Sequence, residues 1–241
     1  METNLILLTG TIQPAGGVNV VLTNPTIRYQ QYASSIGYFL NETEFDDVVF
    51  VENSDYEFDA EQFHWIAKSL KKRFEYIHRH ISPEFQKEIG LKGKSLGEAD
   101  LIDFAIKNSR LIPGHKSIYK ITGRCQLLNA SQLLHHQMAD NEFIVSFRRK
   151  WLTTYFFRVN VDDYIKILSP IATLMDDSIE HNIERLWYKK VKEEISNRNC
   201  FCFMPRIHGV YGNSDGKTYD KSKFEYIVGD FVCKTKLGKI M

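Results

Sequence analysis

Residues 117–124 read Ser-Ile-Tyr-Lys-Ile-Thr-Gly-Arg, a short β-branched and aromatic run that ends in a small polar turn. The run predicts a buried strand over 117–121. Because side chains alternate along a strand, Lys120, Thr122 and Arg124 would share one side, so that two cations and a hydroxyl converge where the strand leaves the sheet. A cluster of structural salt bridges is the alternative explanation for these cations.

The sequence before this strand alternates between strand and helix signals. Strands are expected at 5–8 and 48–51, and helices from Asn24-Pro25 to about Leu40, over 61–81, and through 101–106 after the glycine-bearing loop 93–98. Strands separated by helices pair in parallel, so the sequence predicts an α/β fold with a mixed, mainly parallel sheet flanked by helices. Such sheets bind ligands at the carboxyl ends of their strands.

The second half of the chain is richer in β signals. Residues 143–147 and 151–159 predict two strands joined by a turn at 148–150, and a helix is expected from Asp176-Asp177 to about Ser196. A strand at 200–204 precedes a glycine-, lysine- and tyrosine-rich stretch that we expect to be loop. We therefore predict one domain over 1–241, with a nucleotide-binding half (1–124) and an acceptor or catalytic half (125–241).

Composition excludes several classes of protein. The chain has 241 residues with 31 Lys and Arg against 30 Asp and Glu, so no global field attracts nucleic acid. Its longest unbroken apolar run is far shorter than the roughly 20 residues that a membrane helix needs. The apolar run at 5–8 is too short for a signal peptide, so we expect a cytoplasmic protein. The four cysteines lack zinc-ligand spacing and are expected to be buried thiols.

Two polar segments near strand and helix ends are candidates for ligand binding. Glu52, which is followed by Asn-Ser-Asp, could accept hydrogen bonds from a ribose or a pyrimidine, although a polar turn explains it equally well. Lys94 opens a predicted helix whose free N–H groups suit a phosphate. The glycine spacing there is incomplete for a P-loop, which excludes a kinase or ATPase of that type.

Acidic and basic residues of the second half are candidates for catalysis. Asp177 and Glu180 lie near the expected helix start, where a carboxylate could act as a general base or merely cap the helix. The glycine-rich segment 205–217 carries Arg206, His208 and Lys217, which could close over a diphosphate, or form only a surface loop.

The order of these parts resembles the GT-A class of nucleotide-sugar glycosyltransferases, over nearly the whole chain. Thr9-Gly10-Thr11 resembles the first-strand exit of that class, Arg28 a cation on its first helix, and Glu52 the acidic residue that holds the nucleoside. The other resemblances are those of Gly97–Ala105 to the helix before the central strand, Asp177–His181 to the segment that supplies the base, and His208 with Lys217 to the diphosphate loop.

One departure from that class concerns the metal. Most GT-A enzymes end the central strand in Asp-x-Asp, which holds a divalent cation, whereas this chain has Thr122-Gly123-Arg124. We therefore expect no metal cofactor, with Lys120 and Arg124 supplying fixed positive charge to the leaving diphosphate. Mg²⁺ or Mn²⁺ is the less favoured alternative, held by Asp55 and Asp59 or by Asp162 and Asp163.

The resemblance implies transfer of a sugar from a nucleoside-diphosphate sugar to a hydroxyl of a growing surface glycan, such as an O-antigen or capsule of a bacterium. Glu180, or Asp177 as second choice, would take the acceptor proton, and the configuration would be inverted. The acceptor could be lipid-linked, with Lys234, Lys236 and Lys239 against the inner face of the cell membrane.

Three other functions fit parts of the sequence. A sugar nucleotidyltransferase would share the sheet but normally has Arg and Lys directly after the first strand, and 11–20 contains neither. A catalytically silent nucleotide-sugar-binding protein would need no base. A polyanion-binding module would use cations between Lys68 and Arg79, which are dispersed around an expected helix.

Overall fold

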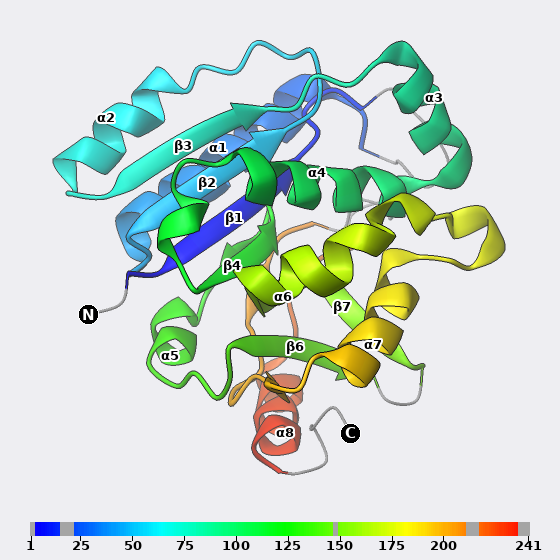
Figure 1. The fold of residues 1–241 in the computed structure, drawn as a ribbon. Helices are drawn as coiled ribbons and strands as arrows, with labels where there is room; N and C mark the ends of the chain where they lie inside the picture. The colour runs from blue at the N-terminus through cyan, green and yellow to red at the C-terminus, as the bar shows by residue number, and fades with distance from the viewer. Residues whose placement is uncertain (1–2, 15–21, 147–148, 211–216, 236–241) are drawn as a thin grey trace.

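The computed structural model describes residues 3–14, 22–146, 149–210 and 217–235 and contains a seven-stranded sheet (Figure 1). Its strand order is β3-β2-β1-β4-β7-β6-β8. The strands span β1 Leu5–Gly10, β2 Asp47–Glu52, β3 Arg73–His78, β4 Ser117–Thr122, β6 Asn141–Ser146, β7 Trp151–Asn160 and β8 Arg198–Cys200. A small second sheet pairs β5 (Gln126–Leu127) with β9 (Ile207–His208).

The pairing confirms the predicted mixed, mainly parallel sheet. Strands β3, β2, β1 and β4 run parallel to one another, β7 is antiparallel to both β4 and β6, and β8 is parallel to β6. Every residue of β1 and β2 is buried, which is typical of parallel strands covered on both faces.

Helices cover both faces of the sheet. Helix α4 (Lys94–Asn108) and helix α7 (Ile183–Glu194) pack with Leu5 and Leu7 on one face. Helix α1 (Pro25–Glu42) and α2 (Glu61–Ser69) pack with Ile6 and Leu8 on the other. Figure 1 shows α4, α6 and α7 in front of the sheet and α1 behind it. The remaining α-helices of the described structure are α3 (Pro83–Lys92), α5 (Ala130–Leu134), α6 (Val161–Asp163) and α8 (Lys223–Lys234).

Local signals account for several element boundaries. Helix α1 begins where expected, because the Asn24 side chain accepts a hydrogen bond from the N–H of Ile27 at 3.2 Å and proline occupies the first turn. The antiparallel pair β6 and β7 confirms the two strands predicted around the turn at 148–150.

Four element predictions are wrong, the first being the strand expected at 200–204, because β8 ends at Cys200 and the next four residues form no strand. The helix expected over 61–81 ends at Ser69, and after a turn with Lys71 at φ 56° the chain forms strand β3. The helix expected from Asp176 starts at Ile183, because Asn182 is its N-cap. The C-terminal stretch expected to be loop contains α8, which begins with a capping box between Ser222 and Glu225.

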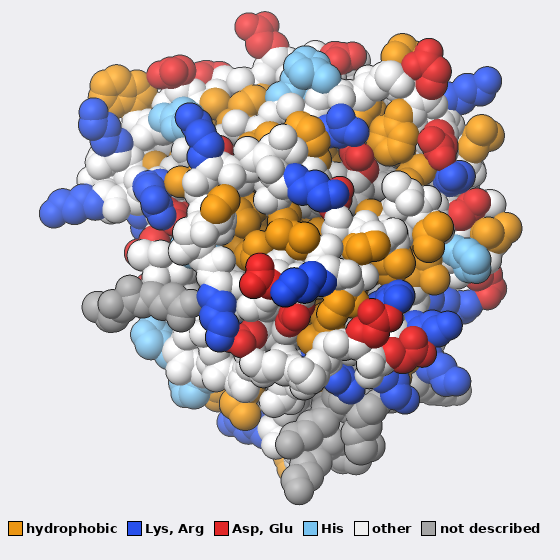
Figure 2. All heavy atoms as spheres, viewed as in Figure 1, with side chains coloured by type: hydrophobic (Ala, Val, Ile, Leu, Met, Phe, Trp, Pro, Cys, Tyr) orange, Lys and Arg blue, Asp and Glu red, His pale blue; other side chains and the backbone are white. Residues whose placement is uncertain are grey.

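The surface carries charges of both signs. Figure 2 shows Lys and Arg side chains interspersed with Asp and Glu over the viewed face, in keeping with the formal net charge of +1. Within the part of the chain that the structure describes, no helix combines the length and the apolar character required to cross a membrane.

Candidate ligand-binding site

The carboxyl ends of four parallel strands form one edge of the sheet. Gly10, Glu52 and His78 lie in one row across β1, β2 and β3, and Thr9 pairs with Thr122 across β1 and β4. The N–H of Gly123 donates to the carbonyl of Thr9 at 2.9 Å, so the exits of the two central strands are joined. Sequence analysis located the candidate site at this edge.

Glu52 holds the loop that follows β1. Its Oε1 atom accepts hydrogen bonds from the N–H of Ile12 at 2.7 Å and from the N–H of Ser54 at 2.9 Å. Its Oε2 atom is buried and has no hydrogen-bond partner among the described residues. Burial raises the pKa of Glu52, and the bonds from Ser54 and Ile12 oppose that rise. Its contacts make Glu52 a group that shapes the site.

Arg28 ties together the two ends of the loop between β1 and α1. Its Nε atom donates to the carbonyl of Thr11 at 2.7 Å, and its Nη1 atom donates to the carbonyl of Leu22 at 3.1 Å. The third contact is with the Tyr32 hydroxyl, at 3.2 Å. The side chain is buried, yet none of the described acidic residues pairs with it. Its partners are therefore neutral dipoles, which leave the positive charge uncompensated.

Arg124 is a second buried cation at the same edge. Its Nη1 atom donates to Oε1 of Gln31 at 3.0 Å, and its Nε atom has no partner in the described structure. Among the described residues it forms no salt bridge. It lines a pocket of about 270 Å³, together with Ile27, Gln30, Gln31 and Ser34 of α1, Gln126, and residues 208–210. Arg28 and Arg124 thus lie beside Tyr32 and Gln31, which are neighbours on α1.

The predicted convergence of Lys120 with Arg124 is wrong. The Lys120 side chain is fully buried, and its Nζ atom binds the Glu98 carboxylate and the carbonyl of Thr154. Glu98 belongs to α4, on the face of the sheet opposite α1, so the two cations point to opposite faces. The strand ends at Thr122 and the chain turns, so alternation does not extend to Arg124. The salt-bridge alternative is therefore right for Lys120.

The N-terminus of α4 already holds an anion from the protein itself. Asp177 accepts hydrogen bonds from the N–H of Ser95 at 3.2 Å and from its hydroxyl at 2.5 Å. Gly93, at φ +99°, provides the space for this carboxylate. The phosphate predicted for the Lys94 loop would have to displace Asp177, so that prediction is wrong.

Gly97 does not line the site. A Cβ atom at this position would lie 3.3 Å from the side chain of Ile89 in α3, so the glycine serves helix packing. Lys94 is exposed at the first position of α4.

The predicted base and its neighbours lie beside this helix start. Glu180 is 77% exposed and pairs with Arg185. Glu184, in the first turn of α7, is half-buried. Burial and the nearby charge of Glu98 raise the pKa of Glu184.

Helix α8 binds one of the cations predicted for the segment 205–217. Arg206 contacts Asp230 of that helix at 3.3 Å, so it anchors α8 and does not point at the strand edge. His208 lines the pocket beside Arg124, and its Nδ1 atom lies 2.7 Å from Asp220. Lys217 is exposed, and the intervening residues 211–216 lie outside the described structure.

One group of side chains could hold a metal ion. Potential ligand atoms of Asp55, His78 and His80 lie within 4.8 Å of one another at the ends of β2 and β3. The Nε2 atom of His78 contacts the carbonyl of Ser54 at 2.8 Å, which leaves Nδ1 as the potential ligand. The sequence pattern does not indicate either histidine as a ligand, because it favours a helix where β3 ends. It indicates Asp55 only with Asp59.

Comparisons with known proteins give structural similarity only. No protein-family model matches the sequence, and no curated protein matches it. The chain is similar to a candidate nucleotide-diphospho-sugar transferase from Desulfovibrio desulfuricans G20, with 11% identity, a TM-score of 0.47, and coverage of 82% of this chain and 79% of that one.

Two fungal structures are also similar. The S. cerevisiae mannosyltransferase Ktr4p has 12% identity and a TM-score of 0.47 over 91% of this chain and 76% of that one. Core-mannan synthase A from Aspergillus fumigatus, in a Mn/GDP form, has 9% identity and a TM-score of 0.49 over 93% and 82%. At these identities, function has to be argued from the residues of this chain.

Proposed function

We propose that this protein transfers a sugar from a nucleoside-diphosphate sugar to an acceptor hydroxyl. The observation that carries the proposal is the pair of buried guanidinium groups, Arg28 and Arg124, at the carboxyl edge of a mainly parallel sheet. They are 7% and 8% exposed, and neither has an acidic partner among the described residues. Burying an unpaired charge is costly, so an anionic ligand is expected to complete the site.

A diphosphate is the anion that fits this arrangement best. Guanidinium groups bind phosphate oxygens in a bidentate manner, and the two groups here contact Tyr32 and Gln31, which are adjacent residues of α1. The buried carboxylate of Glu52 and the side chain of Asn53 shape the neighbouring exit of β2, where a nucleoside would lie in this proposal. The pocket beside Arg124, which His208 also lines, would then hold part of the donor.

The proposed chemistry is a single displacement. A carboxylate takes the proton of the acceptor hydroxyl, the new oxygen–carbon bond forms at the anomeric carbon, and the nucleoside diphosphate departs with its negative charge stabilised by Arg28 and Arg124. A single displacement inverts the configuration.

Three carboxylates near the start of α4 are candidates for the base. Glu180 and Asp177 were expected from the sequence, but Asp177 is engaged as a helix cap and Glu180 is exposed and paired. The half-buried Glu184, whose pKa is raised by burial, is better suited to accept a proton near neutral pH.

The metal site implied by the GT-A resemblance does not fit this chain. Where most of that class have Asp-x-Asp after the central strand, Thr122-Gly123-Arg124 offers no carboxylate, and we propose transfer without a metal ion at that place. Full activity in excess chelator would support this, whereas complete loss that Mg²⁺ or Mn²⁺ restores would refute it. If Asp55→Asn causes a partial loss of activity, a metal ion held by Asp55, His78 and His80 at the ends of β2 and β3 would be indicated instead.

The acceptor and cellular role are proposed from the resemblance alone. They comprise a growing bacterial surface glycan, such as an O-antigen or capsule, carried on a lipid at the cytoplasmic side of the membrane. Residues 1–124 would bind the nucleotide, and residues 125–241 would bind the acceptor within the same domain.

Ligand binding gives the first test. We expect nucleoside diphosphates and their sugar conjugates to raise the melting temperature, since a ligand that binds only the folded state stabilises it by mass action. Nucleosides without phosphate should have little effect. If no nucleoside diphosphate shifts the melting temperature at millimolar concentration, the proposal is wrong. Release or transfer of the sugar in a mixed donor assay then separates a transferase from a silent binding protein.

A further inference from the structure

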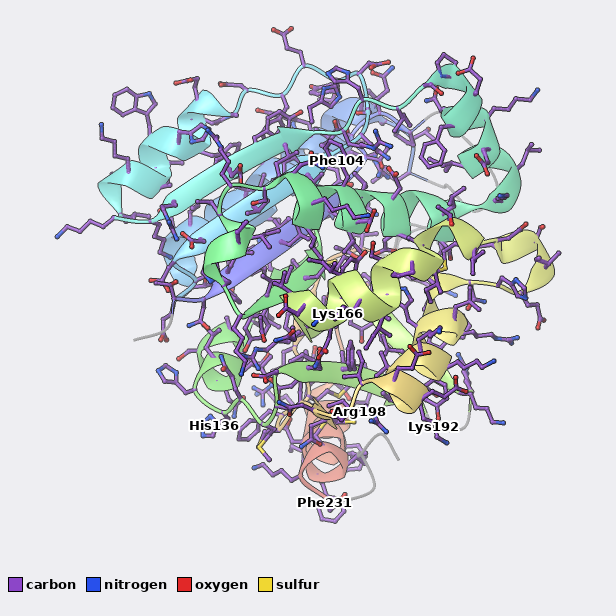
Figure 3. All side chains as sticks on the ribbon, viewed as in Figure 1. Phe104, His136, Lys166, Lys192, Arg198 and Phe231 are labelled. Carbon is purple, nitrogen blue, oxygen red and sulfur yellow. The ribbon has the colours of Figure 1, made fainter. Side chains whose placement is uncertain are left out.

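Helix α8 exposes its apolar side chains to solvent. Large apolar residues of α8 are exposed to 39–72% of their full area, and they recur at helical spacing. They are Phe224, Ile227, Val228, Phe231 and Val232. Figure 3 labels Phe231, whose ring points away from the body of the molecule. We call these five residues the α8 stripe.

The opposite side of α8, which is polar or small, packs on the protein. A Cβ atom on Gly229 would overlap the side chain of Met204, so the helix backbone lies directly against that residue. Asp230 accepts a hydrogen bond from the N–H of Met204 at 2.8 Å and pairs with Arg206. The guanidinium of Arg206 also lies 5.5 Å from the ring centroid of Tyr226. These contacts fix which side faces outward, so the stripe is not simply a misplaced core face.

Lysines lie at the two ends of the stripe: Lys223 is exposed, the Nζ atom of Lys221 lies 3.9 Å from Sδ of Met204, and that of Lys234 lies 4.3 Å from the ring centroid of Phe203. Lys221 and Lys223 precede or begin the helix, and Lys234 ends it. In sequence, residues 217–241 contain six lysines and three acidic residues, and Lys236 and Lys239 lie outside the described structure. Apolar side chains flanked by lysines match the interface of an anionic bilayer, where the apolar groups enter the acyl region and the cations meet lipid phosphates.

We propose that α8 docks the protein on an anionic lipid bilayer, with its stripe inserted at the interface. The occupant is a membrane surface and not a second copy of the chain, because lysines at both ends of the helix attract lipid phosphates and would repel the lysines of an identical partner. Docking rests on the proposed function in one respect only, namely that a lipid-linked acceptor would lie at the same membrane surface. It connects to the pocket through His208, which contacts Asp220 just before α8.

Vesicle sedimentation tests the proposal. The full-length protein should bind vesicles of phosphatidylcholine with 30–40% phosphatidylglycerol, a proportion of roughly that order supplying the surface charge that attracts basic segments. The double variant Ile227→Asp/Phe231→Asp should bind these vesicles at least about tenfold more weakly, since two inserted side chains are lost. Leu91→Asp is the matched control, because Leu91 is 71% exposed on α3, and its binding should be unchanged.

Two outcomes would overturn the docking proposal. Failure of the unaltered protein to bind charged vesicles overturns the proposal, and so does a monomer–dimer equilibrium that the double variant abolishes, since a second copy would then occupy the stripe. All variants replace exposed side chains, so their melting temperatures should be unchanged. Unchanged melting temperatures would show that the variants fold. Nucleoside-diphosphate binding measured on the same samples is expected to be equal, so that its absence counts against the proposed function and not against docking.

Discussion

The proposed function depends most on one side chain, the guanidinium of Arg124. Replacing it with glutamine keeps polar contact with Gln31 and removes the charge. We expect affinity for a nucleoside diphosphate to fall by about 10- to 100-fold, because a hydrogen bond to a charged group contributes about 1.5–3 kcal/mol. Calorimetric titration measures this. Arg149→Gln, at an exposed position, should bind normally, and equal affinities of the two variants would contradict the role of Arg124.

Lys120 makes a different prediction, because its partner is internal. Lys120→Met leaves Glu98 without its cation, and we expect the free energy of unfolding to fall by about 2–3 kcal/mol. This lies below the loss of about 3–5 kcal/mol for fully enclosed pairs, because Glu98 is 24% exposed. The double variant Lys120→Met/Glu98→Gln should recover part of the loss in denaturant unfolding. No recovery would mean that packing, rather than charge, dominates there.

The choice of base is tested at the residue scale as well. Glu184→Gln should lower turnover by about 10²- to 10⁴-fold with little change in donor affinity, as expected for loss of a general base. Glu180→Gln is the matched control on an exposed, paired carboxylate. A large loss in the control, together with a normal rate for Glu184→Gln, would return the role to Glu180.

At the scale of elements, the junction between α3 and α4 depends on one glycine. A Cβ atom on Gly93 would lie 2.4 Å from Oδ2 of Asp177, and the backbone φ of +99° disfavours any other residue. We expect Gly93→Ala to cost about 1–3 kcal/mol, because it strains the backbone and displaces the α4 cap. Gly90→Ala, in open space within α3, should be neutral or stabilising by up to about 1 kcal/mol. Thermal unfolding of both variants decides this.

The elements that could be predicted from sequence are those with signals in their own residues. Strands β1, β2 and β4 are apolar runs between polar turns, and α1 carries its cap at Asn24. Strand β3 was missed because the apolar residues of 61–81 fit a helical period throughout, and no glycine or proline marks the turn at Lys71. Helix α8 was missed because its composition suggested a loop, although Ser222 and Glu225 form a capping box.

The site was predictable in its location but only partly in its members. The rule that ligands bind at the carboxyl ends of parallel strands identified the exits of β1, β2 and β4. The capping of α4 by Asp177 joins Ser95 to a residue 82 positions away, and no local pattern reveals such a contact. The orientation of Lys120 depends equally on where α4 packs.

For the whole molecule, buried carboxylates predict stability that is greatest in mildly acidic solution. Burial opposes ionisation of Asp47, but bonds from His115 and Arg73 prevail and lower its pKa, so its stabilisation is lost as pH falls below about 4. Burial raises the pKa of Glu142 from 4.5 to about 7, so its folded form binds a proton more tightly than the unfolded chain does.

Because of Glu142, the free energy of unfolding should fall by up to about 3 kcal/mol as pH rises from about 4.5 to about 7. Denaturant unfolding across this range measures the fall. Glu142→Gln should flatten it, whereas Glu88→Gln, on an exposed i,i+4 pair, should not. An unchanged slope in Glu142→Gln would exclude this source of pH dependence.

The sheet and the pocket are completed by different parts of the chain. All seven strands of the large sheet are in place at Cys200, whereas β9, which follows it, pairs with β5 and brings His208 to the pocket beside Arg124. Phe201 and Ile207 still belong to the core that covers the sheet, so it is changes from His208 onward that can remodel one wall of the cavity and leave the sheet intact. Ligand preference can therefore change through that tail while the architecture stays the same.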